Sequence, residues 1–152
     1  MTICTQDRQC ILSNIRRGDP CGRPNVELTE LGEIITETIA YIEEKTNAYF
    51  PQYVIMPDHI HAIIIIDNTA EGDRKGRPYK TLSQIVGALK SVSSNKWLRI
   101  CKERNMIMGS LWQRSYYDHI VRNSQDMMAI RKYICDNPLE WLAENKEEYP
   151  WN

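Results

Sequence analysis

The chain has 152 residues, and its 42% hydrophobic and 26% charged side chains are typical of one globular domain and exclude wholesale disorder. The longest apolar run, residues 62–66, is far shorter than the roughly 18 residues of a membrane helix, and the sequence opens without a secretory signal. Five cysteines without a Cys-x-x-Cys pair favour reduced thiols. We therefore expect a single domain over residues 1–152, cytoplasmic and without a membrane partner.

The net charge of −1 conceals an uneven distribution along the chain. Residues 1–73 carry 5 Lys and Arg against 12 Asp and Glu, residues 74–134 carry 13 against 3, and residues 135–152 carry 1 against 5. A basic middle segment favours a surface that faces a polyanion. The alternative is that folding brings acidic and basic segments together and neutralises them.

The first half of the chain predicts strands around one helix. Residues 2–5 and 10–12 have the pattern of a short hairpin. Apolar residues at three-and-four spacing predict an amphipathic helix over about residues 27–46. Residues 49–56 and 60–66 predict the two clearest strands, and the continuous apolar run of the second is typical of a central strand.

The second half predicts two helices and a strand. Apolar periodicity indicates a helix over about residues 81–104, and aromatic and β-branched residues over 111–121 indicate a strand. The last clear helix, around residues 127–134, has Asn123 or Ser124 as N-cap and ends at Pro138. This order of elements predicts an α+β domain, in which an antiparallel sheet of ferredoxin-like arrangement is covered by helices.

Two short segments carry side chains suited to chemistry. His59 and His61 alternate on a predicted strand, so both imidazoles point to one face, and Asp58 could fix the tautomer of one of them. Tyr133 and Asn137 are neighbours on one helix face. Taken singly, each of these residues is more typical of a structural role. Together, two imidazoles and an amide would hold Mg²⁺ or Mn²⁺ beside a tyrosine nucleophile, with positions left for phosphate oxygens.

Three stretches, residues 54–64, 111–123 and 130–138, resemble the REP-associated tyrosine transposases of the single-tyrosine HUH superfamily. Segments 2–8 and 82–91 are also similar to family segments, so the resemblance covers nearly the whole chain. Family members carry a further stretch before the first strand, whereas this sequence begins inside that strand. The departure bears on full activity, because that stretch is thought to help hold the DNA hairpin.

The resemblance implies a ferredoxin-like fold and a role for each chemical residue. His59 and His61 match the metal ligands, Asn137 falls at a third polar ligand, and Tyr133 matches the nucleophile that cuts and rejoins single-stranded or hairpin DNA. A homodimer is left open, as is the question whether Tyr133 serves its own histidines or a partner's.

Basic and aromatic residues of the second half are candidate DNA contacts. Phosphate contacts are expected from Lys90, Lys96, Arg114 and Arg122, and base stacking from Trp112, Tyr116 and Tyr117. Each of them singly is more typical of surface or core. His119 is interpreted as a packing or hydrogen-bonded histidine.

The sequence thus predicts a metal-dependent transposase that acts through a 5′-phosphotyrosine intermediate. One alternative is a DNA-hairpin-binding protein of transposase descent that no longer cuts. Another, a histidine-triad-type nucleotide hydrolase, is disfavoured because Ile63 stands where a third alternating histidine would be.

Overall fold

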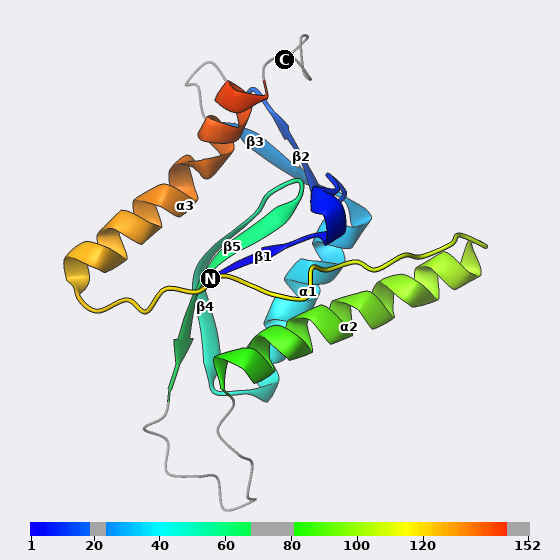
Figure 1. Cartoon of the computed structure of the whole chain (residues 1–152), viewed down its shortest axis with the longest axis horizontal. Coiled ribbons are helices and arrows are strands. Elements are labelled where there is room, and N and C mark those ends of the chain that lie inside the picture. The colour runs from blue at the N-terminus through cyan, green and yellow to red at the C-terminus, as the bar shows by residue number, and fades with distance from the viewer. Residues whose placement is uncertain (19–23, 68–80, 146–152) are drawn as a thin grey trace, which may run out of the picture.

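A three-stranded antiparallel sheet forms the centre of the computed structural model, which describes residues 1–18, 24–67 and 81–145 (Figure 1). Its strands lie in the order β1 (Thr2–Cys4), β5 (His59–Ile66) and β4 (Ala48–Ile55). A separate antiparallel pair consists of β2 (Ser13–Arg16) and β3 (Asn25–Leu28). Helices α1 (Glu30–Lys45) and α2 (Leu82–Glu103) lie on one side of the sheet, and α3 (Ser124–Glu144) lies on the other. In the described ranges, no helix combines the length and the apolar character needed to cross a membrane.

The central strand β5 directs apolar side chains to one side of the sheet and its two histidines to the other. Ile60 and Ala62 are fully buried in the apolar core that α1 and α2 share with the sheet. Because side chains alternate along a strand, His59 and His61 point to the opposite side, toward α3. The prediction that both imidazoles share one face at the start of a strand is confirmed.

Helix α1 shows how local sequence signals fix an element. Thr29 is its N-cap and accepts a hydrogen bond from the amide of Gly32 at 3.2 Å, which satisfies one of the unpaired donors of the first turn. The buried stripe follows the predicted periodicity and consists of Leu31, Ile34, Ile35, Thr38, Ile39 and Ile42. The helix begins later than residue 27 because residues 25–28 pair with β2 instead.

The predicted strand over residues 111–121 is present only in part. Residues 111–117 run antiparallel to β1 and form bridges at Thr5–Trp112 and Thr2–Tyr117. Between these bridges the carbonyls of residues 113–115 bind the ammonium group of Lys90 at 2.8–3.2 Å. Their hydrogen bonds go to a side chain, so the ladder is interrupted and no regular strand forms.

This interrupted segment completes the ferredoxin-like order. The chain runs β1, α1, β4, β5, α2 and then residues 111–117, which is the β-α-β-β-α-β succession of that fold. In space the segment, β1, β5 and β4 lie side by side. The predicted α+β class is therefore confirmed, with β2, β3 and α3 as additions.

Two local predictions are wrong. Residues 2–4 do not form a hairpin with residues 10–12; they pair with residues 59–61 of β5, and residues 6–8 form the short 3-10 helix η1. Pro138 does not end the last helix, because α3 continues to Glu144. Pro138 is buried on the sheet side of α3 together with Ile134 and Asn137, and this packing outweighs the backbone hydrogen bond that a proline removes.

Candidate functional site: histidines and a tyrosine in one cavity

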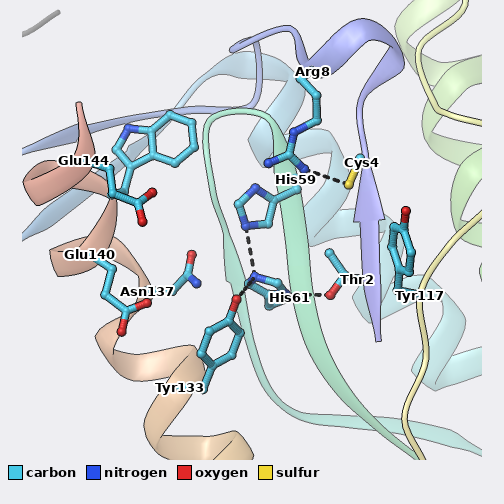
Figure 2. Close-up of a pocket in the computed structure, with 11 residues that line it drawn as sticks. Thr2, Cys4, Arg8, His59, His61, Tyr117, Tyr133, Asn137, Glu140 and Glu144 are labelled. Carbon is cyan, nitrogen blue, oxygen red and sulfur yellow. Dashed lines mark hydrogen bonds between the residues drawn. The ribbon is translucent and has the colours of Figure 1, made fainter.

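The side chains singled out for chemistry meet in one cavity of about 310 Å³ between the β1 and β5 strands and helix α3 (Figure 2). It is lined by Thr2, Cys4, Arg8, His59, His61, Tyr117, Tyr133, Asn137, Glu140, Trp141 and Glu144. Residues that are distant in the sequence therefore contribute to a single site.

The two histidines are held by different partners and converge on each other. His59 Nδ1 lies 2.5 Å from Asp58 Oδ1, and His61 Nδ1 lies 2.8 Å from the hydroxyl oxygen of Thr2. Since a carboxylate can only accept a hydrogen bond, Nδ1 of His59 is the donor to Asp58, and Nε2 of His59 faces His61. The two Nε2 atoms are 3.0 Å apart. Asp58 has the orienting position that the sequence suggested.

Burial keeps His61 neutral. Burial is the main cause, and the neighbouring His59 a second cause, of a pKa of His61 that is lowered from 6.5 to about 3, whereas Asp58 acts in the opposite direction. The imidazole of His61 therefore carries a lone pair throughout the neutral pH range, as a metal ligand must.

Tyr133 reaches these histidines within one chain. Its hydroxyl oxygen lies 3.2 Å from His61 Nε2, and the two rings meet edge to face at 5.0 Å. Asn137 follows one helical turn later and is buried, with its side chain directed into the same cavity (Figure 2). A single chain thus brings the tyrosine to its own histidines.

The donor set fits a divalent ion. Two nitrogen ligands of one ion, each about 2.1 Å from it and at right angles, are about 3 Å apart, which is the separation of the two Nε2 atoms. In the described ranges, no three His, Cys, Asp or Glu side chains lie close enough to share an ion. A third protein ligand would therefore be the amide oxygen of Asn137.

Two of the expected DNA contacts have structural roles instead. Trp112 is 7% exposed and donates its indole N–H to the hydroxyl of buried Ser93 at 3.1 Å, so its ring offers no face for a base. Burial lowers the pKa of Lys90, and its ammonium group donates to three backbone carbonyls, which equals its number of donors.

The other expected contacts are more accessible. Lys96 lies 3.0 Å from Glu37 on α1, and the hydroxyl of half-buried Tyr116 lies 2.9 Å from that of Ser83. Tyr117 is 70% exposed at the edge of the cavity, and Arg114 and Arg122 are exposed. His119 is hydrogen-bonded to Asp126 at 2.9 Å, in agreement with its interpretation as a packing or hydrogen-bonded histidine.

Sequence reasoning missed six of the residues that line the cavity: Thr2, Cys4, Arg8, Glu140, Trp141 and Glu144. Thr2 and Cys4 reach it through the pairing of β1 with β5. Glu140, Trp141 and Glu144 lie seven, eight and eleven residues after Tyr133, a spacing that returns to the same helix face. A helix that ends at Pro138, as the sequence predicts, does not include these three positions. Arg8 comes from η1 and forms an ion pair of 2.7 Å with Asp58; no sequence pattern indicated it.

A family model described as "Transposase IS200 like" matches residues 20–137, which is most of the chain. The chain belongs to the IS200-like transposase family. An uncharacterized protein of Haemophilus influenzae is 28% identical to this transposase over 157 residues, which cover 93% of this chain and 79% of the relative.

The transposase also shares its fold with a solved structure, that of a REP-associated tyrosine transposase bound to a REP hairpin. The TM-score is 0.63 at 18% sequence identity, and the match covers 92% of this chain. The chain spans 65% of the length of that solved protein.

Proposed function

We propose that this IS200-like transposase cuts and rejoins single-stranded DNA with Tyr133 as its nucleophile. The observation that carries the proposal is the hydroxyl oxygen of Tyr133, which lies 3.2 Å from His61 Nε2. It lies in a cavity that also contains His59 and Asn137. A tyrosine hydroxyl beside side chains that could hold a metal ion supports phosphoryl transfer.

The reaction balances without a nucleotide cofactor. The hydroxyl oxygen of Tyr133 attacks the phosphorus of a phosphodiester and loses its proton, while the bond from phosphorus to the 3′ oxygen breaks and that oxygen gains a proton. The products are a 5′-phosphotyrosine and a free 3′-hydroxyl. A second 3′-hydroxyl reverses the step and joins two strands, because the phosphotyrosine conserves the bond energy.

The proposed cofactor is Mg²⁺ or Mn²⁺. When bound by His59, His61 and Asn137, the ion would polarise the phosphate and neutralise developing charge, because a tyrosine hydroxyl with a pKa near 10 is a weak nucleophile alone. Asp58 and Thr2 hold the Nδ1 atoms of the two imidazoles, so both Nε2 atoms are directed to the ion.

The proposed substrate is single-stranded DNA next to a hairpin. The structurally similar transposase was solved with a REP hairpin, and exposed Tyr117 at the cavity offers an aromatic face on which a base can stack. Arg114 and Arg122 are exposed cations on the segment that passes the cavity toward α3, and we assign them to phosphate contacts.

Substitution of Tyr133 by phenylalanine tests the nucleophile. The wild-type protein, incubated with a labelled single-stranded hairpin and Mn²⁺, should form a protein–DNA adduct that survives a denaturing gel. Tyr133→Phe should form no adduct and should bind the hairpin within about twofold of wild type, because the ring and its packing remain.

Tyr41→Phe is the matched control, since Tyr41 is an exposed tyrosine on α1 outside the cavity, and it should form adduct at the wild-type rate. An adduct that persists in Tyr133→Phe would assign the nucleophile to another residue. A wild-type protein that binds the hairpin but yields no adduct would show a hairpin-binding protein without strand transfer.

A further inference from the structure

Arg8 enters the cavity from an unusual turn. In η1, Asp7 and Arg8 have φ angles of 54° and 55°, in the left-handed region that residues other than glycine seldom adopt. Strained backbone persists where the surrounding structure holds it, and it gathers at functional sites. The strained turn therefore makes the Arg8 side chain a candidate for a functional role.

Hydrogen bonds from Thr5 hold the turn against the segment that precedes the histidines. Thr5 is fully buried, and both its amide and its hydroxyl donate to the carbonyl of Asp58 at 2.9 Å. The hydroxyl also lies within hydrogen-bonding distance of the carbonyl of Gln9 at 2.9 Å. These hydrogen bonds fix the backbone around Arg8 relative to the start of β5.

The guanidinium of Arg8 is only partly engaged. Its Nε lies 2.7 Å from Asp58 Oδ2, and its Nη1 donates to Cys4 Sγ at 2.9 Å. A guanidinium has five N–H donors, so the partners in the described ranges account for two of them. The side chain is about half exposed and points into the cavity beside His59 (Figure 2).

The charges around the cavity make Arg8 the candidate partner for a phosphate. Among the described residues that line the cavity, Arg8 is the sole lysine or arginine, whereas Glu140 and Glu144 contribute two carboxylates. A phosphodiester that approaches Tyr133 thus meets one fixed cationic side chain. An arginine fork matches two phosphate oxygens, and such a pair strengthens as charge develops on the phosphate.

We propose that Arg8 binds the phosphate that Tyr133 attacks, while its ion pair with Asp58 holds the guanidinium in place. The inference rests on the proposed strand transfer and names a further catalytic residue for it. The competing role is purely positional: Arg8 would orient Asp58, Asp58 would orient His59, and DNA would never touch the guanidinium.

A substrate without charge at the scissile phosphate distinguishes phosphate binding by Arg8 from a purely positional role. Binding is measured in a Tyr133→Phe background with two labelled hairpins, one natural and one with a single methylphosphonate at the scissile position. With Arg8 present, the natural hairpin should bind at least about tenfold more tightly. Arg8→Ala should abolish this preference by weakening only the natural hairpin. Equal weakening of both hairpins would overturn the proposal.

The rate of adduct formation gives a second measurement. With Tyr133 intact, Arg8→Ala should slow adduct formation by about 100-fold at saturating Mn²⁺. Arg104→Ala, a matched control at the C-terminal end of α2, should react at the wild-type rate. If Arg8→Ala merely needs more Mn²⁺ than wild type and reaches the wild-type rate once its own site is saturated, Arg8 acts through the histidines instead.

A further variant controls for a loss of folding in Arg8→Ala. Arg8→Lys keeps a cation beside buried Asp58 but lacks the fork, and it should lose most of the preference for the natural hairpin. If the wild-type protein forms no adduct at all, the proposed strand transfer fails. The hairpin comparison still decides whether Arg8 contacts that phosphate.

Discussion

Buried His61 makes the stability of this transposase depend on pH. Its pKa is about 3 in the folded chain, against 6.5 for an exposed histidine. Between these values the unfolded chain takes up a proton that the folded chain does not bind, so the free energy of unfolding falls as the pH falls. The full stabilisation from neutral His61 is present above pH 6.5.

Urea denaturation with a chelator present, from about pH 7 to about pH 4, measures this dependence. One such proton contributes a slope of up to about 1.4 kcal/mol per pH unit. His61→Gln lacks the titrating group and should lose stability less steeply over the same range. Parallel curves for wild type and variant would contradict the assignment.

Alternation along a strand and spacing along a helix were enough to predict four of the eleven residues that line the cavity. They placed His59 with His61, and Tyr133 with Asn137, because each pair lies within one element. Arg8 could not be found this way. Its position depends on a left-handed turn and on pairing between β1 and β5, and neither leaves a local pattern in the sequence.

The helices α1 and α2 each contain a glycine, and the two differ in the space around them. A Cβ built on Gly32 of α1 would lie 2.2 Å from the carbonyl oxygen of Leu12, whereas nothing lies within 4 Å of one built on Gly87 of α2. Gly32→Ala should therefore destabilise the fold by about 1–3 kcal/mol through overpacking. Gly87→Ala should stabilise it by about 0.5–1 kcal/mol through helix propensity. Thermal or urea denaturation of both variants measures the two signs, and a stabilising Gly32→Ala would disprove the close approach.

Element prediction succeeded where periodicity was long and failed where tertiary contacts decide. The α1 and α2 helices and the β4 and β5 strands were predicted with nearly correct bounds, because their apolar patterns extend over several turns or over a whole strand. The strand predicted over residues 111–121 was overestimated, since Lys90 of α2 donates hydrogen bonds to the carbonyls of residues 113–115. The length of α3 was underestimated, since burial of Pro138 is invisible in the sequence.

On the scale of the whole molecule, the basic middle segment is partly neutralised. Arg104 of α2 forms a two-pronged ion pair with Glu30 at 2.6 Å and 2.7 Å, and Lys96 pairs with Glu37. Both acidic partners lie on α1, which packs against α2. The sequence suggested either a basic face or neutralisation by folding, and these described pairs favour neutralisation for the side of α2 that faces α1.

Salt dependence should therefore distinguish structural cations from DNA contacts. Each phosphate contact with single-stranded DNA contributes about 0.7 to the slope of log affinity against log salt. Arg114→Gln should reduce the slope by about that amount. Lys90→Met should leave the slope unchanged and lower the free energy of unfolding by about 1–2 kcal/mol, because three carbonyls lose their donor. Fluorescence anisotropy titrations across salt concentrations, with parallel denaturation curves, test both statements.

The 72 positions that separate His61 from Tyr133 have a consequence for the host cell. During translation the imidazoles leave the ribosome long before the hydroxyl of Tyr133 is made, so under the proposed mechanism an unfinished polypeptide could not cut DNA. Proteolytic release of α3 would remove the proposed nucleophile in the same way. The proposed strand transfer therefore needs β5 and α3 in one folded molecule.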